Sequence, residues 1–175
     1  MLELQPADPG DAEGLFALRE AAARWLVGRG IRQWLPGEVD LRTVREQIDA
    51  GEWFLHRRAG RVPVALRFLW SDPAFCGQRP DHAAYVHGLM IDRRHAGEGL
   101  GAAALRWAEK RARGAGRTFL RLDHAADNPG LARYYRELGL HERGTRQFEA
   151  WGPVTLVEKE LTRKTPETEG LRGSA

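Results

Sequence analysis

The chain is poor in cysteine and has no long hydrophobic run. Of its 175 residues, only Cys76 is a cysteine. A single thiol excludes a disulfide within the chain and gives no support to a cysteine-based metal site. No apolar stretch is long enough to cross a membrane, and the first residues lack the pattern of a signal peptide. We therefore expect a cytoplasmic protein of bacterial type, with no metal and no membrane partner.

Charge of one sign is also scarce. The chain has 27 Lys and Arg against 24 Asp and Glu, a net charge of +3. Nucleic-acid-binding proteins usually concentrate their basic residues on one element, whereas here they alternate with acids along the chain. This distribution indicates no nucleic-acid partner and allows at most a local basic patch for a phosphorylated ligand.

The hydrophobic residues, 42% of the chain, are enough for one domain with its own core. Their periodicity predicts strands over 2–6, 53–59, 62–70, 83–91, 118–123, 142–151 and 153–161, and helices over 11–30, 41–51, 102–114 and 128–140. We expect an α/β (α+β) domain over 1–162, with a mixed, mostly antiparallel sheet of about seven strands and about four helices. The unit from Tyr85 to Asp123 is expected to be a parallel strand–helix–strand crossover. The polar segment 163–175 is expected to be a disordered tail.

The sequence HAGEGLG, residues 95–101, joins a predicted strand to a predicted helix. The first N–H groups of a helix have no partners inside it, and the helix dipole adds partial positive charge there. Gly97, Gly99 and Gly101 would let the backbone approach a bulky anion closely. The loop therefore predicts a phosphate or pyrophosphate site. A plain connection with glycines for tight packing is the alternative.

Two nucleotide motifs compete for this loop. The nucleotide P-loop needs Lys and Ser or Thr after its last glycine, but Ala102 follows Gly101, which excludes it. The dinucleotide pattern G-x-G-x-x-A does fit Gly97, Gly99 and Ala102, with Asp123 where a ribose-binding acid would lie. Two features argue against the dinucleotide pattern. Residues 92–96 separate the glycines from the preceding strand, and this strand–helix–strand unit is not the first of a repeating series. An NAD-dependent oxidoreductase stays as the less favoured alternative.

A third pattern extends from Leu89 to Leu140. A strand end Leu89-Met90-Ile91 precedes the glycine loop, and a later segment runs from Asn128 through Tyr134 and Tyr135 to Gly139 and Leu140. This stretch resembles the GCN5-related N-acetyltransferase (GNAT) superfamily, whose pattern is R-G-x-G-x-G followed by N-x-x-A-x-x-L-Y-x-x-x-G-F. Two positions depart from it: Ala96 replaces the usual Arg or Gln, although Arg94 lies nearby, and Leu140 replaces Phe.

The resemblance implies the GNAT fold and transfer of an acetyl group from acetyl-CoA to a primary amine of a small molecule or peptide, by direct attack in a ternary complex. In this family the glycine loop holds the pyrophosphate of the cofactor, and the strand end pairs its backbone with the pantetheine arm. The cofactor-binding residues implied here are Leu89, Met90, Ile91, Arg94, Ala96, Gly97, Glu98, Gly99, Leu100, Gly101, Ala102, Asn128 and Tyr135. For Asn128, a simple helix cap is the alternative.

Two residues are implied to carry the chemistry. Tyr135 occupies the family's general-acid position, where a phenol can donate a proton to the departing thiolate. His87 is the predicted base, directly or through water, because its pKa suits the task and its strand parity matches that of Leu89 and Ile91. Core packing is the alternative for both residues. His124 is a weaker candidate base.

The acceptor site is less well marked. Trp34 and Trp151 lie in regions that frame the acceptor in this family, so both are predicted to bind substrate. They would serve equally well in the core or at the interface of a possible homodimer. No cluster of acidic residues indicates a polycationic acceptor such as an aminoglycoside. A catalytically silent domain that binds acetyl-CoA as a sensor is the alternative to an enzyme.

Overall fold

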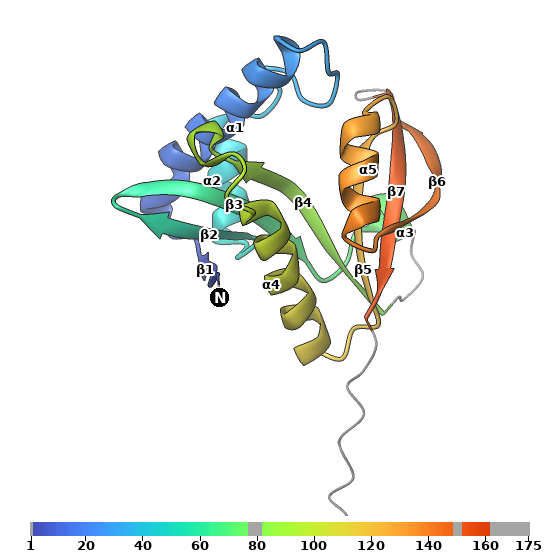
Figure 1. The fold of residues 1–175 in the computed structure, drawn as a ribbon. Helices are drawn as coiled ribbons and strands as arrows, with labels where there is room; N and C mark the ends of the chain where they lie inside the picture. Colours follow the sequence, from blue (N-terminus) through green and yellow to red (C-terminus); the bar gives the residue numbers. More distant parts are fainter. Residues whose placement is uncertain (1, 77–81, 149–151, 162–175) are drawn as a thin grey trace, which may run out of the picture.

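The computed structural model describes residues 2–76, 82–148 and 152–161. They form a single seven-stranded sheet with helices on both faces (Figure 1). The strands are β1 (Gln5–Pro6), β2 (Trp53–Arg58), β3 (Arg61–Leu69), β4 (Ala83–Ile91), β5 (Phe119–Ala125), β6 (His141–Phe148) and β7 (Gly152–Glu160). The α-helices are α1 (Ala12–Val27), α2 (Leu41–Asp49), α3 (Pro73–Cys76), α4 (Leu100–Gly114) and α5 (Pro129–Glu137). No helix in these ranges is long and apolar enough to span a membrane.

The strands follow the order β1-β2-β3-β4-β5-β7-β6, in which β4 and β5 are parallel and every other pair is antiparallel. This confirms the expected mixed sheet with a central parallel crossover through α4. The predicted strand over 2–6 is shorter than expected, and the four-residue helix α3 follows β3, where the sequence predicted no helix. The predicted tail at 163–175 lies outside the described residues.

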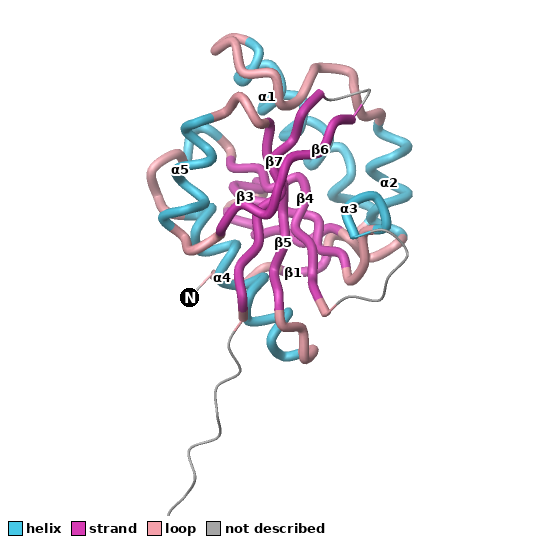
Figure 2. The backbone as a smooth tube through the Cα atoms, turned by 90° about the vertical axis from the view of Figure 1, so that its right-hand side faces the viewer, coloured by secondary structure: helices cyan, strands magenta, loops and turns pink. Residues whose placement is uncertain are grey.

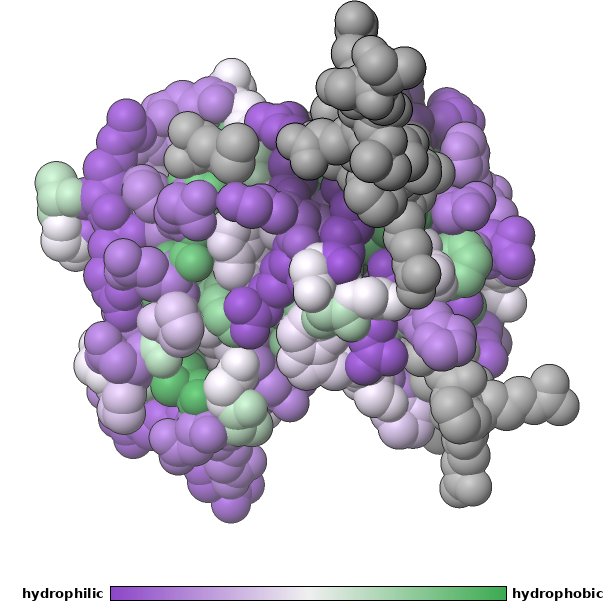
Figure 3. All heavy atoms as spheres, turned by 90° about the horizontal axis from the view of Figure 1, so that it is seen from below, coloured by the Kyte–Doolittle hydropathy of each residue, from purple (hydrophilic) through white to green (hydrophobic). Residues whose placement is uncertain are grey.

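Each face of the sheet has its own core because the side chains of a strand alternate between faces. Val64, Leu66 and Val86 pack under α4 and α5, whereas Leu55 and Met90 pack under α1 and α2. Figure 2 shows the sheet between α4 and α5 on one side and α2 on the other. Seen from below, the surface is mostly hydrophilic with small apolar patches (Figure 3).

The two parallel strands separate soon after they pair. Only three pairs join β4 to β5, from Ala83–Phe119 to Tyr85–Arg121, although β4 continues to Ile91. A β-bulge on the β3 side of β4 lies just beyond, where Gly88 has a φ of +55°. Bulges bend a strand and increase its twist, so β4 leans away from β5 (Figure 1). The divergence opens the sheet at its centre.

Candidate active site

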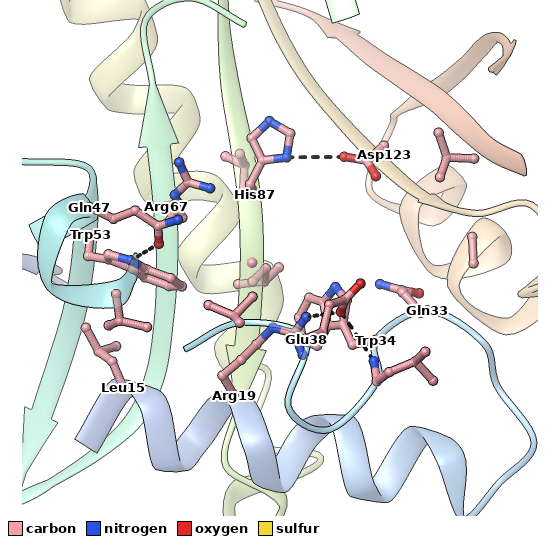
Figure 4. Close-up of a pocket in the computed structure, with 18 of the residues that line it drawn as sticks. Leu15, Arg19, Gln33, Trp34, Glu38, Gln47, Trp53, Arg67, His87 and Asp123 are labelled. Atoms are coloured by element: carbon pink, nitrogen blue, oxygen red, sulfur yellow. Dashed lines mark hydrogen bonds and ion pairs between the residues drawn. The ribbon is translucent and has the colours of Figure 1, made fainter. Parts of the chain in front are cut away.

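A cleft of about 830 Å³ occupies the opening between β4 and β5. Its walls are β3, β4, β5, the inner faces of α1 and α2, the connection between these helices (residues 28–40), and Tyr135 of α5 (Figure 4). The residues that line it include Leu15, Arg19, Arg32, Trp34, Val39, Val44, Trp53, Arg67, Asp72, His87, Leu89, Asp123 and Tyr135. Three predicted site residues that are distant in sequence, Trp34, His87 and Tyr135, therefore border one cavity.

The glycine loop leads into α4 with a backbone suited to an anion. Gly97 and Gly99 have φ values of +88° and +72°, in the left-handed region that favours glycine. No side chain caps α4, and the hydrogen bond that closes its first turn runs from Ala103 N to Gly99 O. The N–H groups of residues 100–102 therefore have no acceptor within the helix. They form the kind of cradle that binds phosphate at a helix N-terminus.

The charged side chains of the loop are paired with each other. Arg94 bonds to Asp92, and this bond lowers the pKa of Asp92 to about 2. Glu98 accepts hydrogen bonds from His95 at 2.8 Å and from Arg58 at 2.9 Å, which lower its pKa. The acids next to the cradle are thus neutralised by local cations, so they oppose an incoming anion less than free carboxylates would.

Gly101 allows α5 to pack against the first turn of α4. A Cβ atom added at Gly101 would lie 2.7 Å from the hydroxyl oxygen of Tyr134, which is closer than real Cβ atoms approach another atom. Tyr134 itself packs against the apolar core under α4 and α5. The third glycine of the loop is therefore needed for helix packing, whereas the first two shape the backbone.

His87 lies between two carboxylates. Its Nε2 is 2.7 Å from Oδ2 of Asp72, and its Nδ1 is 3.3 Å from Oδ1 of Asp123. Burial alone would lower the pKa of His87, but the bonds to Asp123 and Asp72 outweigh it and raise the pKa to about 9. His87 is therefore an imidazolium at neutral pH and must lose a proton before it can act as a base. Asp72 and Asp123 supply the charge that keeps it protonated.

The expected side-chain parity of His87 is wrong. His87 lies opposite Arg67 and Met90 lies opposite Ala65, so His87 and Met90 face the same side of the sheet. Leu89 and Ile91 pack on the other side, with the core under α4 and α5. The bulge at Gly88 inserts an extra residue and reverses the alternation at this point. His87 therefore faces α1 and α2.

Tyr135, on α5, is buried with 6% of its surface exposed and lines the cleft. Burial raises the pKa of its phenol, so the hydroxyl keeps its proton. His124 packs with its ring centroid 5.9 Å from that of Tyr135. It is not among the residues that line the cleft, and its Nδ1 bonds to the carbonyl of Ala125 at 2.8 Å. Of the two histidines considered as bases, only His87 faces the cleft.

Asn128 caps α5 and also contacts the α1–α2 connection. Its Oδ1 accepts from the N–H of Leu131 at 3.0 Å, and its Nδ2 donates to Oε1 of Gln33 at 3.3 Å. The same connection carries Trp34, whose ring stacks under the guanidinium of Arg19 at 4.2 Å. Trp151, the other tryptophan predicted to bind substrate, lies outside the described residues.

Sequence reasoning missed Asp72, Arg19 and Arg67 as residues of the cleft. Asp72 lies in a segment with the composition of an ordinary polar loop, and Arg19 lies on α1 among surface-like charges. Arg67 lies on β3, where side chains alternate between the two faces of the sheet. This alternation predicts which face Arg67 is on, but not which residues it meets there. Only the three-dimensional arrangement brings these side chains to one cavity.

Comparisons with known proteins identify the family and the fold of the chain. The profile of the Acetyltransferase (GNAT) family matches residues 19–140. An uncharacterized N-acetyltransferase, YesJ of Bacillus subtilis (strain 168), is 33% identical over 165 residues, which are 90% of this chain and 89% of that protein. A GNAT-family acetyltransferase from Listeria monocytogenes 4b F2365 superposes with a TM-score of 0.72 at 27% identity, covering 91% of this chain and 94% of that one. The acetyltransferase yncA from Salmonella typhimurium, solved with its cofactor acetyl-CoA, shares the fold with a TM-score of 0.68 at 18% identity, covering 97% and 99% of the two chains. The chain therefore belongs to the GNAT family of acetyltransferases.

Proposed function

We propose that this protein transfers the acetyl group of acetyl-CoA to a primary amine of a small molecule or peptide, by direct attack in a ternary complex. One observation carries the proposal: one cleft at the divergence of β4 and β5 is lined both by Tyr135 and by the charged cluster of His87. The mixed sheet, with one parallel pair, does not support the alternative of an NAD-dependent oxidoreductase.

The chain offers acetyl-CoA two backbone features. The N–H groups at the start of α4, beyond Gly97 and Gly99, would hold the pyrophosphate, with Arg94 at the edge of the loop. The side of β4 that faces β5 pairs for only three residues, so its end from Leu89 to Ile91 would pair with the pantetheine arm as an added strand. Asn128, at the start of α5, would reach the arm from the other wall.

Tyr135 would act as general acid. Acetyl-CoA supplies a thioester whose thiolate leaves when the amine attacks, and that thiolate needs a proton. The hydroxyl of Tyr135 stays protonated because the side chain is buried, which raises the pKa of its phenol. The backbone N–H groups near Ile91 would polarise the thioester carbonyl.

His87 would accept the proton of the attacking amine, directly or through water. Asp72 and Asp123 hold both of its ring nitrogens and fix the ring in the cleft. With a pKa of about 9, the neutral imidazole that can take a proton is a minor form at neutral pH and becomes abundant above it. The two carboxylates would also attract the ammonium form of the acceptor.

A calorimetric titration with acetyl-CoA, and separately with NADH, tests the cofactor. A thiol-release assay over a panel of primary amines then tests transfer, with Tyr135→Phe as the variant that should lose it. Acetyl-CoA binding without turnover on any amine, and unaffected by Tyr135→Phe, would instead indicate a silent sensor domain. Binding of NADH but not of acetyl-CoA would exclude acetyl transfer.

A further inference from the structure

The walls of the cleft carry charges of both signs. At the catalytic end, Asp72 and Asp123 flank His87, so this end is negative whether or not His87 is protonated. Arg32, next to Gln33 on the α1–α2 connection, also lines the cleft and forms no ion pair with any described residue. The other cations of the cleft, Arg19 and Arg67, are paired with Glu38 and Glu52. One positive charge on the α1–α2 connection is therefore left uncompensated.

Arg19 also has an unused hydrogen-bond donor. The side chain is buried, with 8% of the residue exposed, and its Nη2 donates to Oε2 of Glu38 at 2.8 Å. Its Nη1 is buried and has no hydrogen-bond partner among the described residues. Buried donors are nearly always satisfied, because an unpaired one costs free energy. Since Arg19 lines the cleft, an unsatisfied nitrogen of its guanidinium points to an acceptor atom on the ligand.

The walls of the cleft also carry apolar side chains. Leu15, Val44, Trp53 and Val39 line it next to Arg19, and Figure 4 shows Arg19, Trp34 and Glu38 together on the α1 side, with His87 and Asp123 on the sheet side. A ligand that fits this arrangement has an ammonium at one end, an apolar body, and an acidic group at the other end. A polyamine would bring a second positive charge to Arg32.

We propose that the amine acceptor carries a carboxylate across an apolar body from its amine, and that Arg19 and Arg32 bind this carboxylate. The inference rests on the proposed acetyl transfer and specifies the class of acceptor. The guanidinium of Arg19 lies against the ring of Trp34 and its Nη1 is buried, so the side chains around that nitrogen have to shift when the carboxylate reaches it. Arg32 is exposed and needs no such movement.

The test uses acceptor pairs that differ only in the acidic group. Suitable pairs are benzylamine and its para-carboxylate, hexylamine and ε-aminocaproate, and an apolar dipeptide and its C-terminal amide, with spermidine as the polycation. Because charge-assisted hydrogen bonds contribute about 1.5–3 kcal/mol, we expect kcat/KM to favour the carboxylate member of at least one pair by roughly tenfold or more. The C-terminal amide of the dipeptide keeps the carbonyl oxygen but lacks the negative charge, so this pair measures the effect of the charge alone.

Variants then assign the preference to residues. Arg32→Gln should reduce it roughly two- to fivefold, as expected for an exposed charge. Arg29→Gln is the matched control on the same connection, because Arg29 stacks on Trp25 and does not line the cleft. Arg19→Met should abolish the preference and Arg19→Lys should keep part of it, with a thermal melt to establish that each variant is folded. Titration of acetyl-CoA should give the same Kd for all four variants.

Any of three results would overturn the inference. One is a wild-type enzyme that acetylates the decarboxylated amines or spermidine as well as, or better than, the carboxylates. Another is a carboxylate preference that survives both Arg32→Gln and Arg19→Met. The third is an absence of acceptor binding. In that case the protein binds acetyl-CoA, but calorimetry in the presence of CoA detects binding of neither member of any acceptor pair. Failure of the proposed function is distinct, because acetyl-CoA would then not bind or no amine of any charge would be acetylated.

Discussion

The carboxylate of Asp72 lies 2.7 Å from Nε2 of His87, so a residue just beyond β3 holds a histidine in the middle of β4. Asp123 of β5 holds the other ring nitrogen across the gap where the two parallel strands part. Three segments of the chain thus meet at one imidazole. Because both ring nitrogens are bonded to carboxylates, the protonated form of His87 is favoured and its ring cannot turn freely.

This arrangement predicts how stability depends on pH. A group whose pKa is higher in the folded than in the unfolded protein stabilises the fold fully below the unfolded value, and this contribution is lost as pH rises through the folded value. For His87 these values are 6.5 and about 9. The free energy of unfolding should therefore fall between pH 6.5 and 9 by up to ~3 kcal/mol relative to His87→Gln. Urea unfolding at several pH values measures this difference, and parallel curves for the two proteins would contradict it.

The same cluster predicts a pH profile for turnover. If neutral His87 accepts the amine proton, kcat at saturating substrate should rise with pH, with its half-maximum near pH 9 and its plateau above that. Asp72→Asn removes one of the two carboxylates but keeps an oxygen for the N–H of Ala74, at the start of α3. With one carboxylate fewer, the pKa of His87 should fall, so the rise of kcat with pH should occur at lower pH in this variant. If the rise of kcat with pH is unchanged in Asp72→Asn, the group that controls it is not His87.

Two adjacent tyrosines give a matched pair of variants. Tyr135 lines the cleft, whereas the hydroxyl of Tyr134 lies against Gly101. General-acid catalysis contributes about 10²–10⁴ in rate, so Tyr135→Phe should lower kcat by roughly that factor, with an unchanged melting temperature. Tyr134→Phe should leave kcat within about twofold. Equal losses of kcat in both variants would mean that neither hydroxyl delivers a proton.

Part of the site could be predicted from the sequence because its signals are local. The glycines of the loop, the cap Asn128 and the position of Tyr135 on its helix lie within continuous stretches, where spacing along the chain sets the geometry. The order of strands and helices follows from periodicity in the same way. The start of α4 at Leu100, two residues before the predicted one, reflects the weak helix signal of a glycine-rich first turn.

The remaining part depends on contacts between distant segments. The parity of His87 could not be predicted, because a bulge depends on how β3 pairs with β4 and leaves only a glycine, Gly88, as a local signal. Asp72 and Asp123 reach His87 from different elements, and Arg19 meets Glu38 through the α1–α2 connection. Neither a period nor a motif joins such residues in the sequence.

The packing of Gly101 against Tyr134 predicts a specific interaction between two substitutions. Gly101→Ala places a methyl group 2.7 Å from the hydroxyl oxygen of Tyr134, so the start of α4 or α5 must shift. We expect a stability loss of about 1–3 kcal/mol and at least roughly tenfold weaker acetyl-CoA binding, because the N–H groups of the cradle move with the helix. Gly114→Ala, near the other end of α4, meets no atom within 4 Å and is the matched control.

The double variant decides whether this contact is the cause. Tyr134→Phe removes the oxygen that the new methyl group would strike, so adding it to Gly101→Ala should recover most of the lost stability and affinity. Thermal melts and acetyl-CoA titrations of the two single variants and the double variant give the coupling between the positions. Additive losses would mean that the glycine is required by the backbone of the loop rather than by the tyrosine that packs on it.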